Sequence, residues 1–127
     1  MGDRYLRNLA KSLMGQLGIT VEDLAGEFPD CEAQYLYEHR SKEIKAQLRR
    51  MRPETLGRIA ACGKGRTEEG ETQQGPWLYH VHCGAYLDKY ADGVSLLREI
   101  ACTAIVAEMA NILRLRKEFA AYAPPGV

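Results

Sequence analysis

The chain has 127 residues, of which 46% are hydrophobic and 27% charged, and its 17 Lys and Arg balance its 17 Asp and Glu. This length and composition are typical of one globular domain with its own core and exclude a disordered chain. No apolar run approaches the roughly 20 residues of a membrane span, and the first residues lack the apolar stretch of a signal peptide. We therefore expect a soluble, cytoplasmic protein without a membrane partner.

The cysteine pattern predicts reduced, mostly buried thiols rather than disulfides. No two cysteines form a C-x-x-C pair, and a chain of this apolar content can fold without a disulfide framework. The cysteines are Cys31, Cys62, Cys83 and Cys102.

The first third of the chain predicts two helices separated by a short break. Apolar residues between 4 and 17 recur on one face of a helix, and Gly18 is suited to end it. The segment that follows, TVED, has the spacing of a capping box between Thr20 and Asp23. It predicts a short helix that begins at Val21 and ends before Pro29.

The next segment predicts further helices up to residue 62. Asp30 can cap a helix that carries Tyr35, and Ser41 either continues this helix or begins another that runs through Met51. Pro53 is suited to the first turn of a helix over 53–62, because its fixed φ matches the helix and its missing amide is not needed there.

The second half of the chain predicts a loop, a strand and one long helix. Residues 63–76 are rich in glycine and carry no apolar side chain, which indicates a flexible loop. Residues 77–83 favour a strand that pairs across this loop with 58–62. A helix over 94–119, nearly continuous in apolar residues, needs cover on more than one side. It is either the central core helix or also a dimer seam, and we expect a homo-oligomer through it.

Together these elements predict a mainly α protein. We expect a single-domain bundle of short helices over residues 1–127, arranged around the long C-terminal helix, with one small β-hairpin near 58–83.

Residues 18–40 resemble the repressor-type helix-turn-helix unit. Thr20, Leu24 and Ala25 match its T-x-x-x-L-A helix, and Phe28 and Tyr35 match its later buried positions. The resemblance implies a DNA-binding role with a recognition helix after the turn. The chain departs from the family's pattern where Pro29 replaces the usual turn glycine, and where Asp30 and Glu32 place carboxylates near the phosphates.

Positive charge is concentrated between residues 40 and 66, where nine Lys and Arg face two acids. On a helix through Met51, four of these cations fall nearly opposite Ile44 and Leu48, in a stripe that can follow a phosphate backbone. Two tyrosines precede the stripe and could stack on unpaired bases. The candidate nucleic-acid-binding residues are Tyr35, Tyr37, Arg40, Lys42, Lys45, Arg49, Arg50 and Arg52, extended by Arg58, Lys64 and Arg66.

The segment YHVHC is a weaker candidate site. On a strand, His80 and His82 point to the same side and could supply two metal ligands, but no second paired motif accompanies them. Two half-buried histidines that make ordinary hydrogen bonds, or a Cys83–His nucleophile pair, are the alternatives. We expect no metal, no cofactor and no catalytic site, since no acid–base pair stands out.

The sequence therefore predicts a small binding protein rather than an enzyme. The leading hypothesis is a regulator that binds DNA or RNA through phosphate contacts of the basic 40–66 face. The alternative is an adaptor or inhibitor that uses the same face against an acidic partner protein.

Overall fold

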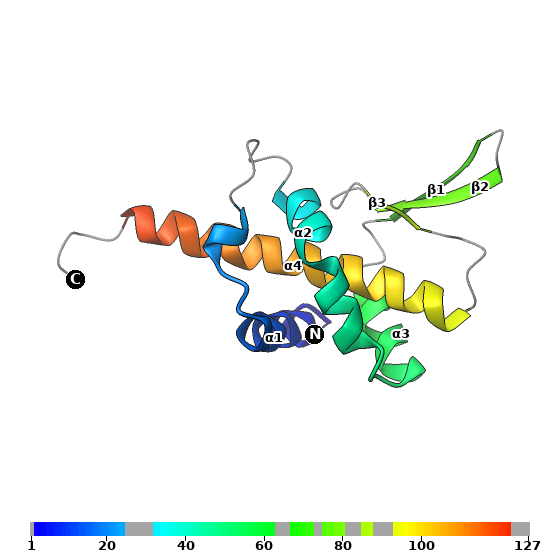
Figure 1. The fold of residues 1–127 in the computed structure, drawn as a ribbon, viewed down its shortest axis with the longest axis horizontal. Helices are drawn as coiled ribbons and strands as arrows, with labels where there is room; N and C mark the ends of the chain where they lie inside the picture. Colours follow the sequence, from blue (N-terminus) through cyan, green and yellow to red (C-terminus); the bar gives the residue numbers. More distant parts are fainter. Residues whose placement is uncertain are drawn as a thin grey trace.

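The computed structural model describes residues 2–24, 32–62, 67–72, 75–80, 85–87 and 93–122. The fold is mainly helical, as predicted, and one long helix runs through the length of the molecule (Figure 1). Its helices are α1 (Gly2–Leu17), the 3-10 helix η1 (Val21–Leu24), α2 (Glu32–Leu48), α3 (Pro53–Cys62) and α4 (Gly93–Tyr122). The helix α4 packs against each of the others, which makes it the central element of the fold.

The end of α1 is built as predicted. Gly18 has φ 64°, in the left-handed region that glycine adopts without strain. The amide of Ile19 donates to the carbonyl of Met14 at 2.9 Å, which closes a Schellman turn. Ile19 then packs into the core at 3% exposure, so the turn also fixes where the chain leaves the helix.

The capping box after this turn is present in one half. The amide of Thr20 donates to Oδ2 of Asp23 at 2.8 Å, and the amide of Asp23 donates to the carbonyl of Thr20 at 2.9 Å. The hydroxyl of Thr20 donates instead to Glu22. Within the described residues, the element that follows is the single 3-10 turn η1. The rest of the predicted short helix, with Pro29 and the proposed cap Asp30, lies outside the described residues.

Residues 32–62 form two helices whose bounds follow local signals. Ser41 continues α2, so 32–48 is one helix that buries Leu36, Ile44 and Leu48 on a single face. The helix α2 ends at Leu48, three residues before the predicted end at Met51. The helix α3 begins at Pro53 and ends at Cys62, as predicted.

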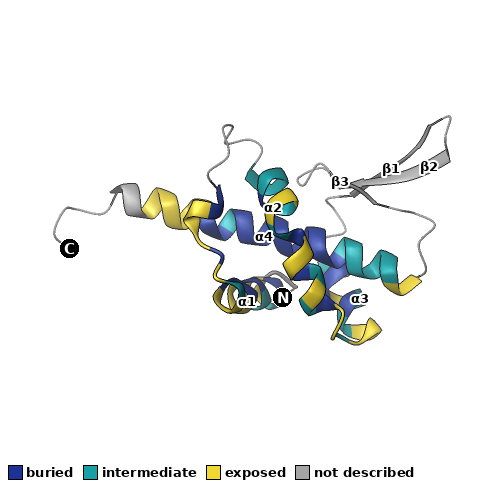
Figure 2. Ribbon diagram, viewed as in Figure 1, coloured by how far each residue is buried: buried dark blue, intermediate teal, exposed yellow. Residues whose placement is uncertain are grey.

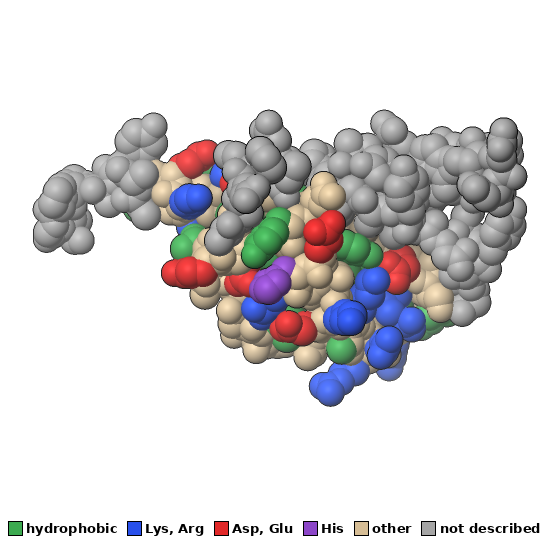
Figure 3. Space-filling model, turned by 45° about the horizontal axis from the view of Figure 1, so that its top comes forward, with side chains coloured by type: hydrophobic (Ala, Val, Ile, Leu, Met, Phe, Trp, Pro, Cys, Tyr) green, Lys and Arg blue, Asp and Glu red, His purple; other side chains and the backbone are tan. Residues whose placement is uncertain are grey.

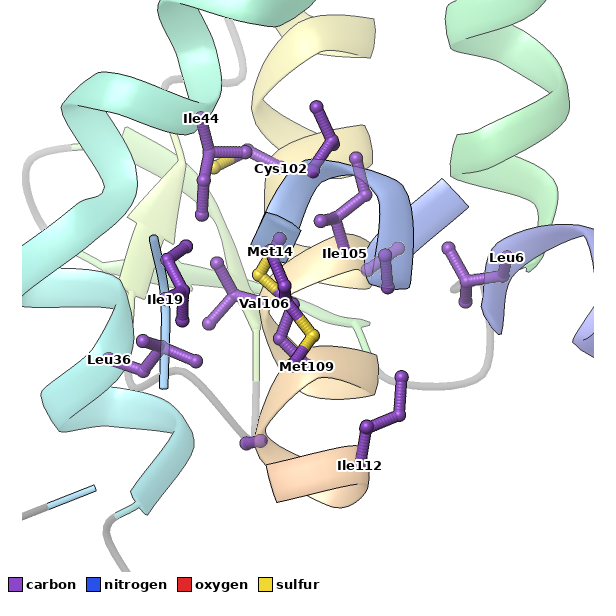
Figure 4. Packing of buried hydrophobic residues seen from close by; sticks show 14 of the residues in the cluster. Leu6, Met14, Ile19, Leu36, Ile44, Cys102, Ile105, Val106, Met109 and Ile112 are labelled. Atoms are coloured by element: carbon purple, nitrogen blue, oxygen red, sulfur yellow. The ribbon is translucent and has the colours of Figure 1, made fainter. Parts of the chain in front are cut away.

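The core lies around the middle of α4, where every residue from 101 to 110 is buried (Figure 2). Figure 4 shows Val106 and Met109 between Leu36 and Ile44 of α2 on one side and Leu6 of α1 on the other. The single chain therefore already covers the run that was expected to need a second copy. The segment 114–119, beyond this run, is exposed.

Three strands form an antiparallel sheet in the order β1-β2-β3: β1 (Thr67–Thr72), β2 (Gly75–His80) and β3 (Ala85–Leu87). The register pairs Thr72 with Gly75 and Thr67 with His80. The hairpin predicted between 58–62 and 77–83 is not seen, because 58–62 is the end of α3. The segment 67–72, predicted as part of a flexible loop, supplies the pairing strand instead, since backbone pairing across a short connection needs no apolar side chains.

Candidate nucleic-acid interface

We call Tyr35, His39, Lys42, Ala46 and Arg49 the outer ridge of α2; Arg49 directly follows the helix, and its amide still donates to the carbonyl of Lys45 at 3.0 Å. With about 3.6 residues per turn, steps of three, four and seven residues keep these side chains on one face. The face opposite carries the buried residues of α2. Lys42 and Arg49 are exposed, and the ridge therefore presents cations to solvent directly opposite the contact with α4.

The turn between α2 and α3 adds two more exposed cations, Arg50 and Arg52. We call Lys42, Arg49, Arg50 and Arg52 the cationic surface. Within the part of the chain that the structure describes, none of these four side chains takes part in an ion pair. Figure 3 shows Lys and Arg side chains gathered over the α2–α3 region, with the histidine side chain on the same face. This arrangement can contact several phosphates at once.

Arg40 was predicted to belong to this surface, but the structure turns its side chain inward. Only 16% of the side chain is exposed, and Nη1 lies 3.2 Å from Oδ1 of Asp23. Nη2 lies 3.0 Å from Oε2 of Glu43 and also donates to the carbonyl of Leu17. Arg40 therefore joins α2 to the end of α1 and to η1, and its charge is already neutralised.

Lys45 and Tyr37 were also predicted to belong to this surface, but both side chains lie in the contact between α2 and α4. Nζ of Lys45 lies 2.9 Å from Oε1 of Glu99, and the Tyr37 hydroxyl donates to Oε2 of the same carboxylate at 3.2 Å. Burial raises the pKa of Tyr37 to about 12, and the charge of Glu99 adds to this shift. Burial lowers the pKa of Lys45, but hydrogen bonds to Glu99 and Tyr37 outweigh it, so this pKa is raised. Both side chains hold α2 against α4.

The more distant members of the predicted basic face separate into two groups. Arg58 is exposed, but its guanidinium carbon lies 3.7 Å from the centre of the Tyr5 ring, which links α3 to α1. Lys64 and Arg66 lie outside the described residues.

Two further cationic segments lie outside the predicted basic face. Arg4, Arg7 and Lys11 recur at steps of three and four along exposed positions of α1, which is the periodicity that could have revealed them. Arg7 lies 3.3 Å from the buried carboxylate of Glu108. The end of α4 carries three exposed cations beside two exposed apolar side chains; these five residues are Arg114, Leu115, Arg116, Lys117 and Phe119.

The helix-turn-helix resemblance is followed by the structure only in part. Leu24 is buried, as the resemblance implies, but its segment is a 3-10 turn. Ala25 and Phe28 lie outside the described residues. The first turn of α2, where a recognition helix meets base edges, carries Glu32, whereas the exposed cations lie toward the other end of α2. The described part of the first turn of α2 therefore lacks cations that could contact phosphates.

The predicted pair His80 and His82 is not tested by the structure. His80 is the last residue of β2, with only its backbone described, and His82 and Cys83 lie outside the described residues. Among the residues that are described, no group of three or more His, Cys, Asp or Glu could hold a metal ion.

Comparisons with known proteins give no further assignment. No family model, no curated protein and no solved structure matches this chain. In the described part of the chain, no helix combines the length and the apolar character that crossing a membrane requires.

Proposed function

We propose that this protein is a small nucleic-acid-binding regulator that contacts phosphates through the cationic surface of α2 and the α2–α3 turn. The observation that supports this proposal is the exposure of Lys42, Arg49, Arg50 and Arg52 without ion-pair partners among the described residues. Unpaired cations on one face can displace the counterions of a polyphosphate backbone, which is the main source of sequence-independent affinity.

The charges around this surface support the same proposal. Two acids lie close in sequence: Glu43 beside Lys42, whose carboxylate is paired with Arg40, and the exposed Glu54, two residues after Arg52. Glu38 accepts a hydrogen bond from Gln34 at 3.3 Å and lies about three helical turns before Arg49. The end of α2 near Arg49 is therefore the more positive end, and the phosphate backbone belongs there.

The test is a fluorescence-anisotropy titration with duplex and single-stranded probes at several salt concentrations. Four phosphate contacts predict a slope of log affinity against log salt of about −3 to −4 on duplex DNA, at about −0.9 for each contact. The double variant Lys42→Glu with Arg49→Glu should flatten this slope by about two units. It should weaken binding to every sequence alike, because phosphates carry no sequence information.

The matched control reverses two exposed cations elsewhere, as Arg4→Glu with Lys11→Glu on α1. It changes the net charge by the same amount and should leave the slope nearly unchanged. Equal losses in the two double variants would show that net charge, rather than the cationic surface, governs binding. Flat titrations of the unaltered protein with all probes at low salt would eliminate the nucleic-acid proposal.

A protein-binding adaptor or inhibitor is the second candidate, and one observation favours it. Leu115 and Phe119 are 55% and 78% exposed on the last described turns of α4, next to Arg114, Arg116 and Lys117. Exposed apolar side chains among cations suit an acidic partner helix with apolar anchors. This candidate predicts no binding to DNA or RNA, and loss of a protein partner when Phe119 is replaced by serine.

A homo-oligomer through 94–119 remains a prediction, but the apolar run of this helix cannot be its contact surface. Since residues 101–110 are covered within one chain, the described parts of α4 that remain exposed for contact with a second copy are Gly93 and Val94 at its start and 114–119 at its end.

A further inference from the structure

We infer that the cationic surface binds an unpaired strand more tightly than a duplex, with a base of that strand stacked on the Tyr35–His39 ring pair. This inference rests on the proposed nucleic-acid function and names the class of ligand for the same site. The two rings stack with their centres 5.6 Å apart and their planes inclined by 15°. Every nucleobase has a π-face, so such a ring pair can stack on any of the bases, whatever the sequence of the strand.

The ring pair and the cations lie in one line. Tyr35, His39, Lys42 and Arg49 share the outer ridge of α2, and Tyr35 and Arg49 are fourteen residues apart. At about 1.5 Å per residue the ridge is about 21 Å long. His39 is exposed and lies one turn closer to Lys42 than Tyr35 does, so a base can extend the stack on the side from which the cations follow.

The charges along the ridge distinguish its two ends. Glu32 and Glu38 lie within three residues of the ring pair in the sequence, whereas Arg49 and Arg50 lie at the other end; the exposed Glu43 between them is paired with Arg40. A duplex lying along the ridge would bring phosphates to both ends and would meet the carboxylates. An unpaired strand can place its phosphates at the cations and a base, with no charge of its own, at the rings.

Tyr37, the second tyrosine predicted to stack on a base, is occupied by contacts within the protein. Its hydroxyl is bound to Glu99 and its ring lies 5.3 Å from Nζ of Lys45, within the contact between α2 and α4. Of the two tyrosines proposed for stacking on the basis of sequence, only Tyr35 lies on the outer ridge.

The test compares a labelled single strand with a hairpin duplex of the same sequence, using anisotropy titrations at one low salt concentration. In the double variant Tyr35→Ala with His39→Ala, affinity for the single strand should fall about 5- to 150-fold. This range corresponds to about 1–3 kcal/mol for one stacked base. Affinity for the duplex should change less than about twofold, and the salt slope should not change, because neither ring contacts a phosphate.

Two controls separate a lost stack from a lost fold. The variant Tyr35→Phe keeps the ring and should retain affinity, and far-ultraviolet circular dichroism should show unchanged helix in all variants. Equal losses on both probes, or no loss on the single strand, would overturn the stacking inference while leaving the cationic surface in place. If the unaltered protein binds neither probe, the proposed function fails and the inference fails with it.

Discussion

Replacing Arg40 with methionine tests whether this residue is structural or belongs to the proposed binding surface. Methionine keeps a long side chain but removes the charge that pairs with Asp23 and Glu43 and donates to the carbonyl of Leu17. Asp23 is only 8% exposed, so its carboxylate would remain buried without its cation. Removing one partner of a buried pair typically costs about 3–5 kcal/mol.

Two features of the structure reduce the stability cost expected for Arg40→Met. The carboxylate of Asp23 keeps its hydrogen bond from the amide of Thr20, and the half-exposed Glu43 contributes at most about 0.5 kcal/mol as an i, i+3 pair. We therefore expect Arg40→Met to lower the free energy of unfolding by about 2–4 kcal/mol. Urea unfolding followed by far-ultraviolet circular dichroism measures this change.

The matched control is Lys42→Met, on the same helix but exposed and without an ion-pair partner among the described residues. It should change stability by no more than about 0.5 kcal/mol. If Arg40→Met costs no more than this control and also flattens the salt slope of nucleic-acid binding, our reasoning is refuted. Arg40 would then belong to the binding surface, as the sequence alone suggested.

Two further predictions concern the contacts of α4. Stability should fall as the pH rises from about 10 to about 12, because the pKa of Tyr37 is raised to about 12 and that of Lys45 is raised as well. In this window the folded state keeps protons that the unfolded chain releases. Unfolding measured at several alkaline pH values tests this prediction, and the tyrosinate absorbance of Tyr37→Phe compared with the unaltered protein identifies the titration of Tyr37. A stability that stays constant over this pH range would contradict the prediction. Ile105→Ala should cost about 2–5 kcal/mol, whereas Phe119→Ala should cost less than about 0.5 kcal/mol and should dissociate any homo-oligomer seen by light scattering. Similar costs for the two variants would show that the core lies elsewhere.

Helix boundaries were predictable where one residue determines them locally. Gly18 ends α1 because the left-handed conformation suits glycine, and Pro53 begins α3 because proline fits a first turn. The mainly α class followed from the same signals together with apolar periodicity. These features depend on neighbours within a few residues, so the sequence contains all that is needed.

Which of the cations are exposed and which are paired with a distant acid was not predictable in this way. Lys45 has nearly the same helical position as its exposed neighbours, and its partner Glu99 comes from a distant helix. Tyr37, which shares that partner, is 62 residues away from it in the sequence. Helical spacing shows which side chains share a face, but only the packing of α2 on α4 shows where that face ends. The pairing of β1 with β2 was not predicted for a related reason. It depends on backbone hydrogen bonds, and the polar side chains of 67–72 gave no pattern typical of a strand.

The burial of α4 also explains where function can reside. Its run 101–110 contains small residues, among them Ala101, Ala104 and Ala107, and all ten positions are buried within one chain. Small side chains let neighbouring helices approach closely, so α1, α2 and α3 together can cover a helix that seemed to need a second copy. A helix covered on all sides can present no ligand-binding residue along that run. Among the described residues of the helices, the surfaces left for a partner are the outward faces of the surrounding helices and the exposed ends of α4. The outer ridge of α2 combines exposed cations with an aromatic stack.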